Sequence, residues 1–305
     1  MNRVRWLKGQ LHVHTSRSFD GRVPPEDMFA AYRLRGFDFL CVTDHDRVWE
    51  RAAVVDGILV VPGEESTLVR PFPPLGRHLV RLFTTEPVPL LASAHRKLEA
   101  TRRQGALAMA AHPAWDGNFG TGRWRIEALA DPLLDLVEIV NHHSRTGANV
   151  ALWDEALARR GPALPLWATA VDDSHRLEQV GRAWVWVAVE QTWDLSLPAA
   201  RLAGMVREAL RRGAFYPSTG ARAIFRWERD GGRSRVVVEA VPPEDEAAPG
   251  VPPRIRLMGK GGRLLVQVEG RRASYAVRGD EGYVRAEVIE PDGRAAWSQP
   301  WWIEA

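Results

Sequence analysis

Short apolar segments that end on a histidine or a carboxylate recur through the first 175 residues, and they constrain the fold more than any other feature. Six of the nine histidines fall in such segments: His12, His14, His45, His78, His112 and His175. Five of the six segments place the polar group at the carboxyl end of an apolar stretch, and helical stretches separate them. This order predicts an α/β protein with parallel strands and a site at the carboxyl rim of the sheet.

The pair His12 and His14 closes an apolar run that begins near Val4. Alternate side chains of a strand share a face, so both imidazoles are expected to point the same way and chelate one ion. Imidazole nitrogens and carboxylate oxygens together suit zinc, manganese or iron. One histidine at a strand end is more often only a loop residue, so the metal-site prediction rests on the recurrence of the pattern.

The other three histidines are weaker candidates. His95 lies in an arginine-rich helical stretch and is expected at the surface. His142 and His143 follow the apolar strand that ends at Asn141, so one of them is expected either to face substrate or to lie in a solvated loop.

The hydrophobic periodicity divides the chain into two parts. Helical stretches are predicted for residues 24–35, 91–104, 148–160 and 197–212, with strands between them. After about Gly220 the pattern changes to short alternating segments separated by glycine-rich turns, which predicts a C-terminal antiparallel β-sandwich domain. Residues 242–253 are expected to form an exposed loop. Trp297, Trp301 and Trp302 are expected to pack this domain against the first.

Composition limits the remaining possibilities. A chain of 305 residues with 45% hydrophobic content can bury one large core and one smaller core. The formal charge of +3 is small and the basic residues are scattered among acids, so nucleic acid is not indicated as a partner. Cys41, the single cysteine, excludes an internal disulfide and is expected in the core. Without an apolar signal or a membrane-length run, a cytoplasmic enzyme is expected.

The polar motifs, taken in order, resemble those of a known family. The set consists of His12-Val13-His14, Asp20-Gly21, Thr43-Asp44-His45, Gly63-Glu64-Glu65, Ala111-His112-Pro113 and Asp173-Ser174-His175. It looks like the motif set of the PHP (polymerase and histidinol phosphatase) superfamily of metal-dependent phosphoesterases, over residues 8 to 219. Residues 213–220 and 296–300 look similar to the CehA/McbA-type metallohydrolases, a branch of that superfamily.

The resemblance implies a distorted (β/α)7 TIM-like barrel over residues 1–219, followed by the small β-sandwich over residues 220–305. It also implies two or three divalent metal ions (Zn, Mn or Fe). By motif position, one ion is held by His12, His14, Glu65 and Asp173, a second by Glu65, His78 and His112, and a third by Asp20, His45 and His175. Asp20 follows His14 by six residues where the family usually has five, which leaves open a shifted or weak third site.

The same motifs indicate which of two neighbouring carboxylates is the expected ligand. The Gly-x-Glu and Asp-x-His patterns favour Glu65 over Glu64 and Asp173 over Asp172, which leaves Glu64 and Asp172 as outer or structural groups. Asp44 is predicted to orient a ligand histidine, because such outer carboxylates fix the tautomer and direction of the ring.

Metal ions a few ångströms apart lower the pKa of a bridging water and supply a hydroxide near neutral pH. Phosphoesters suit such a site, and Arg17, Arg47 and Arg145 are predicted to grip phosphate oxygens. The sequence therefore predicts a phosphoesterase acting on a small-molecule phosphoester. Two alternatives stay open: hydrolysis of a carboxylic ester or carbamate by the same hydroxide, and a non-catalytic binding module. Metal identity, oligomeric state and the class of phosphoester are open as well.

Overall fold

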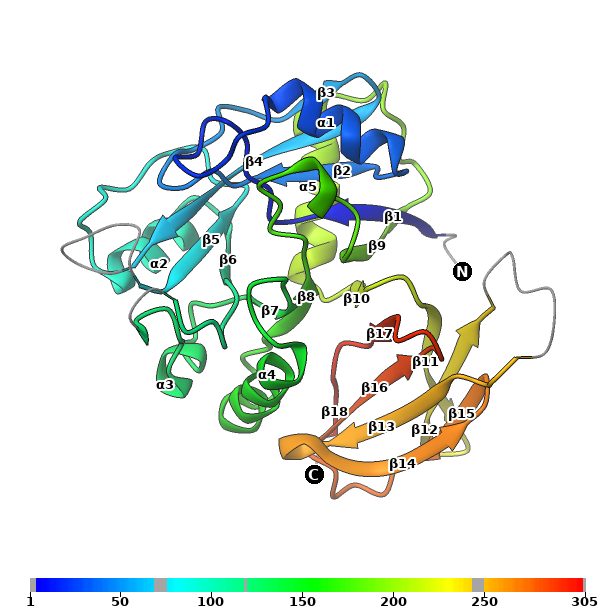
Figure 1. Cartoon of the computed structure of the whole chain (residues 1–305). Helices are drawn as coiled ribbons and strands as arrows, with labels where there is room; N and C mark the ends of the chain where they lie inside the picture. Colours follow the sequence, from blue (N-terminus) through cyan, green and yellow to red (C-terminus); the bar gives the residue numbers. More distant parts are fainter. Residues whose placement is uncertain (1–3, 69–75, 118–119, 243–249, 304–305) are drawn as a thin grey trace.

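The computed structural model describes residues 4–68, 76–117, 120–242 and 250–303, which form a mixed α/β fold (Figure 1). The strands up to residue 218 are β1 (Val4–Gln10), β2 (Phe39–Val42), β3 (Ala53–Val55), β4 (Ile58–Thr67), β5 (His78–Leu82), β6 (Leu107–Ala110), β7 (Leu136–Val140), β8 (Trp167–Ala170), β9 (Trp184–Glu190) and β10 (Phe215–Ser218). The helices are α1 (Pro25–Leu34), α2 (Ala94–Arg103), α3 (Ile126–Leu129), α4 (Thr146–Arg160) and α5 (Ala199–Arg211), with 3₁₀ turns η2 (Leu177–Gln179) and η3 (Lys260–Gly262).

The predicted sheet with parallel strands is confirmed, but its strands are not all parallel. The hydrogen-bonded order is β10-β9-β1-β2-β4-β5-β6-β7-β8. The pairs β1–β2, β2–β4, β6–β7 and β7–β8 are parallel, whereas β4–β5, β5–β6 and β1–β9 are antiparallel. Because β5 runs against its neighbours, its first residue, His78, lies at the rim where the parallel strands end.

The edge of β8 is completed by a side chain. β8 is the last strand of the hydrogen-bonded order and lies beside β9 and β10. Gln299 donates from its side-chain amide to the carbonyl of Ala168 and accepts from the backbone N–H of the same residue, both at 2.9 Å. The amide thus occupies the place of a neighbouring strand residue and covers an otherwise open edge.

The four long helices lie where periodicity predicted them, within about three residues at each end. In α5 the buried positions Leu202, Val206 and Leu210 recur every four residues, so one stripe of the helix faces the sheet. Ser93 caps α2 by accepting a hydrogen bond from the backbone N–H of Arg96. Cys41 is buried in the core formed by alternate strand residues, as expected. Among the described residues, no helix is both long and apolar enough to cross a membrane.

The C-terminal part is built from antiparallel strands. They are β11 (Arg222–Asp230), β12 (Arg233–Val241), β13 (Arg254–Gly259), β14 (Arg263–Glu269), β15 (Arg272–Ala276), β16 (Tyr283–Ile289), β17 (Ala295–Trp297) and β18 (Trp301–Trp302). β11, β12 and β15 form a separate three-stranded sheet, while β14-β13-β16-β17 continues the long sheet through β10. Backbone pairing therefore crosses the predicted boundary at residues 219 and 220, and the division into a barrel and a sandwich domain stays a prediction.

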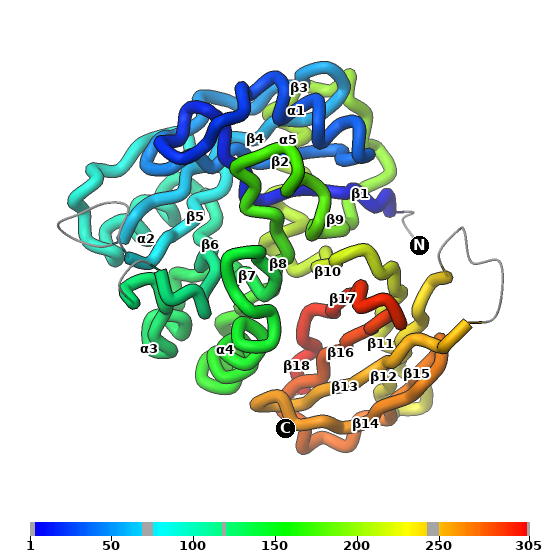
Figure 2. Tube along the Cα trace, in the orientation of Figure 1, coloured from blue at the N-terminus to red at the C-terminus, as the bar shows by residue number. Residues whose placement is uncertain are grey.

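The C-terminal strands pack beside α4 and β8, as the trace in Figure 2 shows. Trp297 and Trp302 contribute to the apolar cluster that also contains Trp153 of α4, which agrees with the expected packing of the C-terminal tryptophans. Arg285 of β16, whose side chain is 1% exposed, donates to both carboxylate oxygens of Asp154 in α4 at 2.6 and 2.8 Å. Of the predicted loop 242–253, residues 243–249 lie outside the described residues.

Candidate metal centre

The structure brings the nine predicted ligands together at one rim of the sheet. His12 and His14 follow β1, His45 follows β2 and His112 follows β6, while Asp173 and His175 follow β8. Glu65 lies within β4, His78 begins β5, and Asp20 lies in the loop before α1. That loop folds tightly: a Cβ added to Gly21 would lie 2.0 Å from the carbonyl oxygen of Thr15, so only glycine fits.

The first ligand group has the dimensions of a tetrahedral metal site. His12 Nε2 and His14 Nε2 are 3.1 Å apart. Glu65 Oε2 lies 3.2 and 3.1 Å from these two nitrogens, and Asp173 Oδ1 lies 3.3 and 3.1 Å from them. These five distances are close to the edges of a regular tetrahedron whose centre lies about 2.0 Å from each corner, the length of zinc–nitrogen and zinc–oxygen bonds.

Glu65 connects this group to a second one. Its other oxygen, Oε1, lies 2.9 Å from His78 Nδ1 and 3.3 Å from His112 Nε2. His45 Nδ1 lies 3.3 Å from Oε2. One carboxylate therefore faces two sets of imidazoles, each through a different oxygen, which is the arrangement expected of a bridging ligand.

The third group contains Asp20. Although Asp20 follows His14 by six residues, its carboxylate still reaches the histidines of this group. Asp20 Oδ2 lies 3.3 Å from His45 Nε2 and 3.1 Å from His175 Nε2. His143 also reaches the rim, because its Nε2 lies 3.6 Å from Asp173 Oδ2. His142 bonds instead to the carbonyl of Asp172 at 2.7 Å. His95 is exposed, as expected, and lies 3.3 Å from Glu99.

Buried carboxylates set the electrostatics of the rim. Burial alone would lower the histidine pKa values, but Asp173 and Glu65 outweigh it, so the pKa of His12 is well above its ordinary value and that of His14 is about 9. Burial would raise the carboxyl pKa values of Glu65 and Asp173, but the surrounding imidazoles hold both well below the usual range. Negative charge is thus retained in a buried pocket, where it attracts protons or cations.

Residue Glu138 was missed by the sequence analysis. It is fully buried in the middle of β7, where its Oε1 lies 2.7 Å from His12 Nδ1 and its Oε2 accepts from the backbone N–H of His112 at 2.6 Å. Asn141 donates to Glu138 Oε2 at 2.8 Å and to Asp173 Oδ2 at 3.0 Å. A lone acid inside the apolar segment Leu136–Val140 was the signal that could have identified Glu138.

The Glu138–Asn141 pair supports two strained ligands. His112 and Asp173 have φ values of 28° and 50°, in the left-handed region that side chains rarely adopt. Each such residue costs on the order of 1–3 kcal/mol and persists only where its surroundings fix it. Glu138 binds the backbone of His112, and Asn141 binds the side chain of Asp173, so the pair holds both in place.

Part of the chain matches a known protein family. Residues 10–83 match the family model described as the PHP domain. This segment of the chain is similar to a PHP domain. The superfamily recognised from the motifs is thereby confirmed, whereas the CehA/McbA branch stays a prediction. The matched segment contains six of the nine candidate ligands, from His12 to His78.

The chain is also similar to a curated protein and to a solved structure. The uncharacterized protein MJ1587 of Methanocaldococcus jannaschii is 26% identical over 167 residues, and the match covers 48% of this chain and 90% of the relative. A crystal structure named "putative metal-dependent phosphoesterase", from Bifidobacterium adolescentis, is 15% identical with a TM-score of 0.41. That match covers 55% of this chain and 87% of the other chain.

The prediction for Asp44 in the PHP domain is wrong. Asp44 does not orient a ligand histidine: its Oδ1 accepts from the backbone N–H of Thr15 at 2.6 Å and its Oδ2 from the hydroxyl of Thr15 at 2.8 Å. These bonds fix the turn that follows His14. The orienting carboxylate is Glu138, because its position in β7 reaches the Nδ1 of His12 and leaves Nε2 for the metal.

The neighbouring acids and the arginines lie outside the ligand groups of the PHP domain. Glu64 accepts from Arg81 at 2.6 Å, and Asp172 accepts from three backbone N–H groups of residues 181–183, which are structural roles. Arg17 lies 4.6 Å from the ring centre of Trp49, while Arg47 and Arg145 are exposed. Among the described residues, no arginine pairs with Asp20, Glu65 or Asp173.

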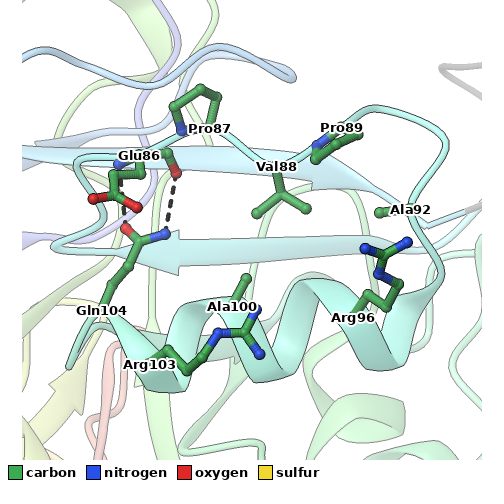
Figure 3. Close-up of a pocket in the computed structure, with 9 residues that line it drawn as sticks. All are labelled: Glu86, Pro87, Val88, Pro89, Ala92, Arg96, Ala100, Arg103 and Gln104. Carbon is green, nitrogen blue, oxygen red and sulfur yellow. Dashed lines mark hydrogen bonds between the residues drawn. The ribbon is translucent and has the colours of Figure 1, made fainter.

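Aromatic side chains border the ligand groups of the PHP domain instead. Phe19, 66% exposed, stacks on His45 with ring centres 4.7 Å apart, and Trp115 lies 4.7 Å from His112. A separate cavity of about 340 Å³ lies between α2 and the loop before it (Figure 3). There the side chain of Gln104 accepts from the backbone N–H of Glu86 and donates to its carbonyl, so the residue fastens the loop. No candidate ligand lines that cavity.

Proposed function

We propose that this protein is a divalent-metal-dependent hydrolase and that its substrates are small-molecule phosphoesters. The observation that carries the proposal is the position of Glu65, whose two oxygens face separate groups of imidazoles at 2.9–3.3 Å. Such a carboxylate suits two cations held a few ångströms apart, which is the arrangement used by many enzymes that hydrolyse phosphoesters.

The residues present fit two or three cations. Asp173 Oδ1 is buried and accepts no hydrogen bond, although it lies between His12 and His14. The nitrogen and oxygen donors favour zinc, manganese or iron. Metal ions bound there would lower the pKa of water, which would supply a nucleophile near neutral pH, and would neutralise charge that develops on the ester.

Residues of the chain supply position and hydrogen bonds. Glu65, Asp173 and the histidines would hold the cations, and Glu138 fixes the ring of His12. His143, whose side chain is 38% exposed, lies at the rim of the same groups, and partial burial of its ring lowers its pKa to about 4, so it is neutral at pH 7. A neutral imidazole at this place can donate a hydrogen bond to a substrate oxygen without adding positive charge.

Hydrolysis of a carboxylic ester or carbamate is the second candidate function. It is favoured by the surroundings of the ligand groups, where Phe19 and Trp115 border the histidines and no described arginine pairs with the carboxylates Asp20, Glu65 and Asp173. A phosphomonoester carries two negative charges and gains more from guanidinium groups than a neutral ester does.

Stripping and reloading the protein tests these proposals. The ions are removed with a chelator, replaced by zinc, manganese or iron, and counted by elemental analysis. Turnover of p-nitrophenyl phosphate or bis(p-nitrophenyl) phosphate that disappears on chelation and returns with metal would support a phosphoesterase. Metal-dependent turnover of p-nitrophenyl acetate alone would favour the second candidate. A metal-replete protein that turns over none of the three would point to a non-catalytic binding module.

A further inference from the structure

An aromatic cleft lies on the outer face of the sheet, away from the ligand rim. Its volume is about 730 Å³. One wall is formed by β1, β9 and β10, and the other by β11 and residues 298–301. Trp6 lies in this cleft, six residues before His12 along an extended segment. At the rise of a strand, this spacing separates the two residues by roughly 20 Å. None of the candidate ligands lines the cleft.

Aromatic rings dominate the walls. The ring of Tyr216 lies 5.4 Å from that of Trp6 and 5.4 Å from that of Phe225, both in edge-to-face contact. Trp167, Trp186 and Trp301 also line the cleft. Trp6 is 46% exposed and Ile224 is 42% exposed, so apolar surface stays open at the mouth. Contiguous apolar surface of this kind marks a binding site more often than a simple surface position does.

The charged residues of the lining have one sign. Among the residues that the structure describes, Arg212 and Arg222 line the cleft, whereas no aspartate or glutamate does. The guanidinium carbon of Arg222 lies 5.4 Å from the ring centre of Trp186, and Arg222 forms no ion pair with any described residue. Arg212 lies 3.5 Å from Glu208 at the surface. A guanidinium that stacks on an aromatic ring keeps its donors free for a carboxylate, sulfonate or phosphate.

We propose that this aromatic cleft binds a planar aromatic ligand that carries one anionic group. The rings of Trp6, Tyr216 and Phe225 provide apolar faces for the ligand ring, and Arg222 receives the anion. The volume falls within the range of about 300–1,000 Å³ that small-molecule sites have. This site does not depend on the metal centre, so it goes beyond the proposed hydrolase function. A second copy of the chain is the competing occupant of the same apolar mouth.

Two fluorescent probes of nearly equal shape test the proposal. 1-Anilinonaphthalene-8-sulfonate carries a sulfonate, and N-phenyl-1-naphthylamine lacks it. Binding to the metal-free full-length protein is followed by quenching of tryptophan fluorescence, and calorimetry gives the stoichiometry. We expect one sulfonate probe per chain. Arg222→Gln should weaken that probe about tenfold and leave the neutral probe unchanged, whereas Trp6→Ala should weaken both.

Arg229→Gln provides the matched control, because Arg229 is an exposed residue of the same strand outside the cleft. It should leave both affinities unchanged. Equal affinities for the two probes, unchanged by Arg222→Gln, would overturn the proposal, as would the absence of saturable binding. A dimer in sedimentation that dissociates on Ile224→Glu would also overturn it, since the cleft would then be covered by a second copy. Arg222→Gln changes only an exposed side chain, so it tests the proposal even if Trp6→Ala fails to fold.

Discussion

Two clusters of buried charge in this molecule differ in what balances them. Between α4 and β16, Arg285 donates to Asp154 at 2.6 Å and to Glu287 at 2.7 Å, so one cation lies between two acids. At the rim, Glu65 and Asp173 are surrounded by imidazoles that are cationic only when protonated. The first cluster carries its own permanent cation, whereas the second depends on protons or metal ions. The acids at the rim are therefore suited to bind metal ions, whereas the acids of the Arg285 cluster are not.

The pKa shifts express the same difference. Burial would lower the pKa of Arg285, but the hydrogen bonds and charge of Asp154 outweigh it and raise that pKa. Arg285 is therefore charged at every pH at which the protein folds. Burial would lower the pKa values of His12 and His14, but Asp173 and Glu65, joined by Glu138 at His12, raise them, and a metal ion would replace the protons on binding.

The largest expected effect comes from breaking the metal-dependent cluster at Glu65. Glu65→Gln removes the charge that joins two ligand groups, so the bound metal should fall by at least one ion per chain. Phosphodiester turnover should fall by at least about 1,000-fold, since several kcal/mol of charge stabilisation are lost. Elemental analysis and kcat/KM for bis(p-nitrophenyl) phosphate measure the two effects.

Glu64→Gln is the control for Glu65, since Glu64 is a buried neighbour that pairs with Arg81 and no ligand. It should keep the full complement of metal. Equal loss of metal in the two variants would mean that Glu65 has no special role.

Arg285→Met should act on stability and leave metal binding intact. The variant leaves Asp154 buried without its cation, while Glu287 keeps Arg256 at 3.3 Å, and the unpaired Asp154 costs on the order of 3–5 kcal/mol of the free energy of unfolding. Urea denaturation measures the loss, and elemental analysis should find unchanged metal. The double variant Asp154→Leu/Arg285→Met should recover most of the stability, because no unpaired charge remains in α4. If the double variant were no more stable than Arg285→Met, the lost stability would not come from the unpaired charge of Asp154.

Glu138→Gln should weaken metal binding without removing a ligand. The amide keeps the shape of the side chain but loses the charge that fixes His12, and outer carboxylates of this kind contribute about 10–100-fold to metal affinity. Calorimetric titration of the metal-free protein with zinc measures the change. Asp135→Asn is the control, because Asp135 is a partly buried acid just before β7 whose carboxylate accepts from the backbone N–H of Ala108 at 2.9 Å. An affinity equal to that of the unmodified protein would refute the positioning role.

The ligands could be predicted because their signal is local. In a His-x-His or Asp-x-His pair at a strand end, three residues suffice to show which side chains share a face. All nine candidates reach the rim. Roles that depend on pairing between distant segments could not be predicted. Glu138 meets His12 across 126 positions of sequence. Asp44 meets Thr15 rather than a histidine, because the loop after β2 lies against the loop after β1 at this point.

The antiparallel direction of β5 shows the same limit at the level of the fold. Periodicity indicates that residues 78–82 form a strand, but it does not give the direction in which that strand joins the sheet. The helices were predicted well because an amphipathic stripe and a cap are encoded within each segment. The continuation of the long sheet from β10 into β17 joins residues 218 and 296, and no local pattern indicates it.

The smallest effect is expected from Arg17→Ala. The guanidinium of Arg17 lies over Trp49 and 3.7 Å from the exposed Glu50, so it is engaged away from the ligand carboxylates. An exposed pair of this kind contributes at most about 1 kcal/mol, and we expect kcat/KM for bis(p-nitrophenyl) phosphate to change by about threefold or less. Arg47→Ala, at an exposed position after His45, is the parallel variant. If KM rose about 100-fold while kcat stayed unchanged, Arg17 would have to turn from Trp49 to the substrate and bind its phosphate. The rim would then be balanced by a permanent cation as well as by metal ions. It would differ less from the Arg285 cluster, which is balanced by an arginine alone.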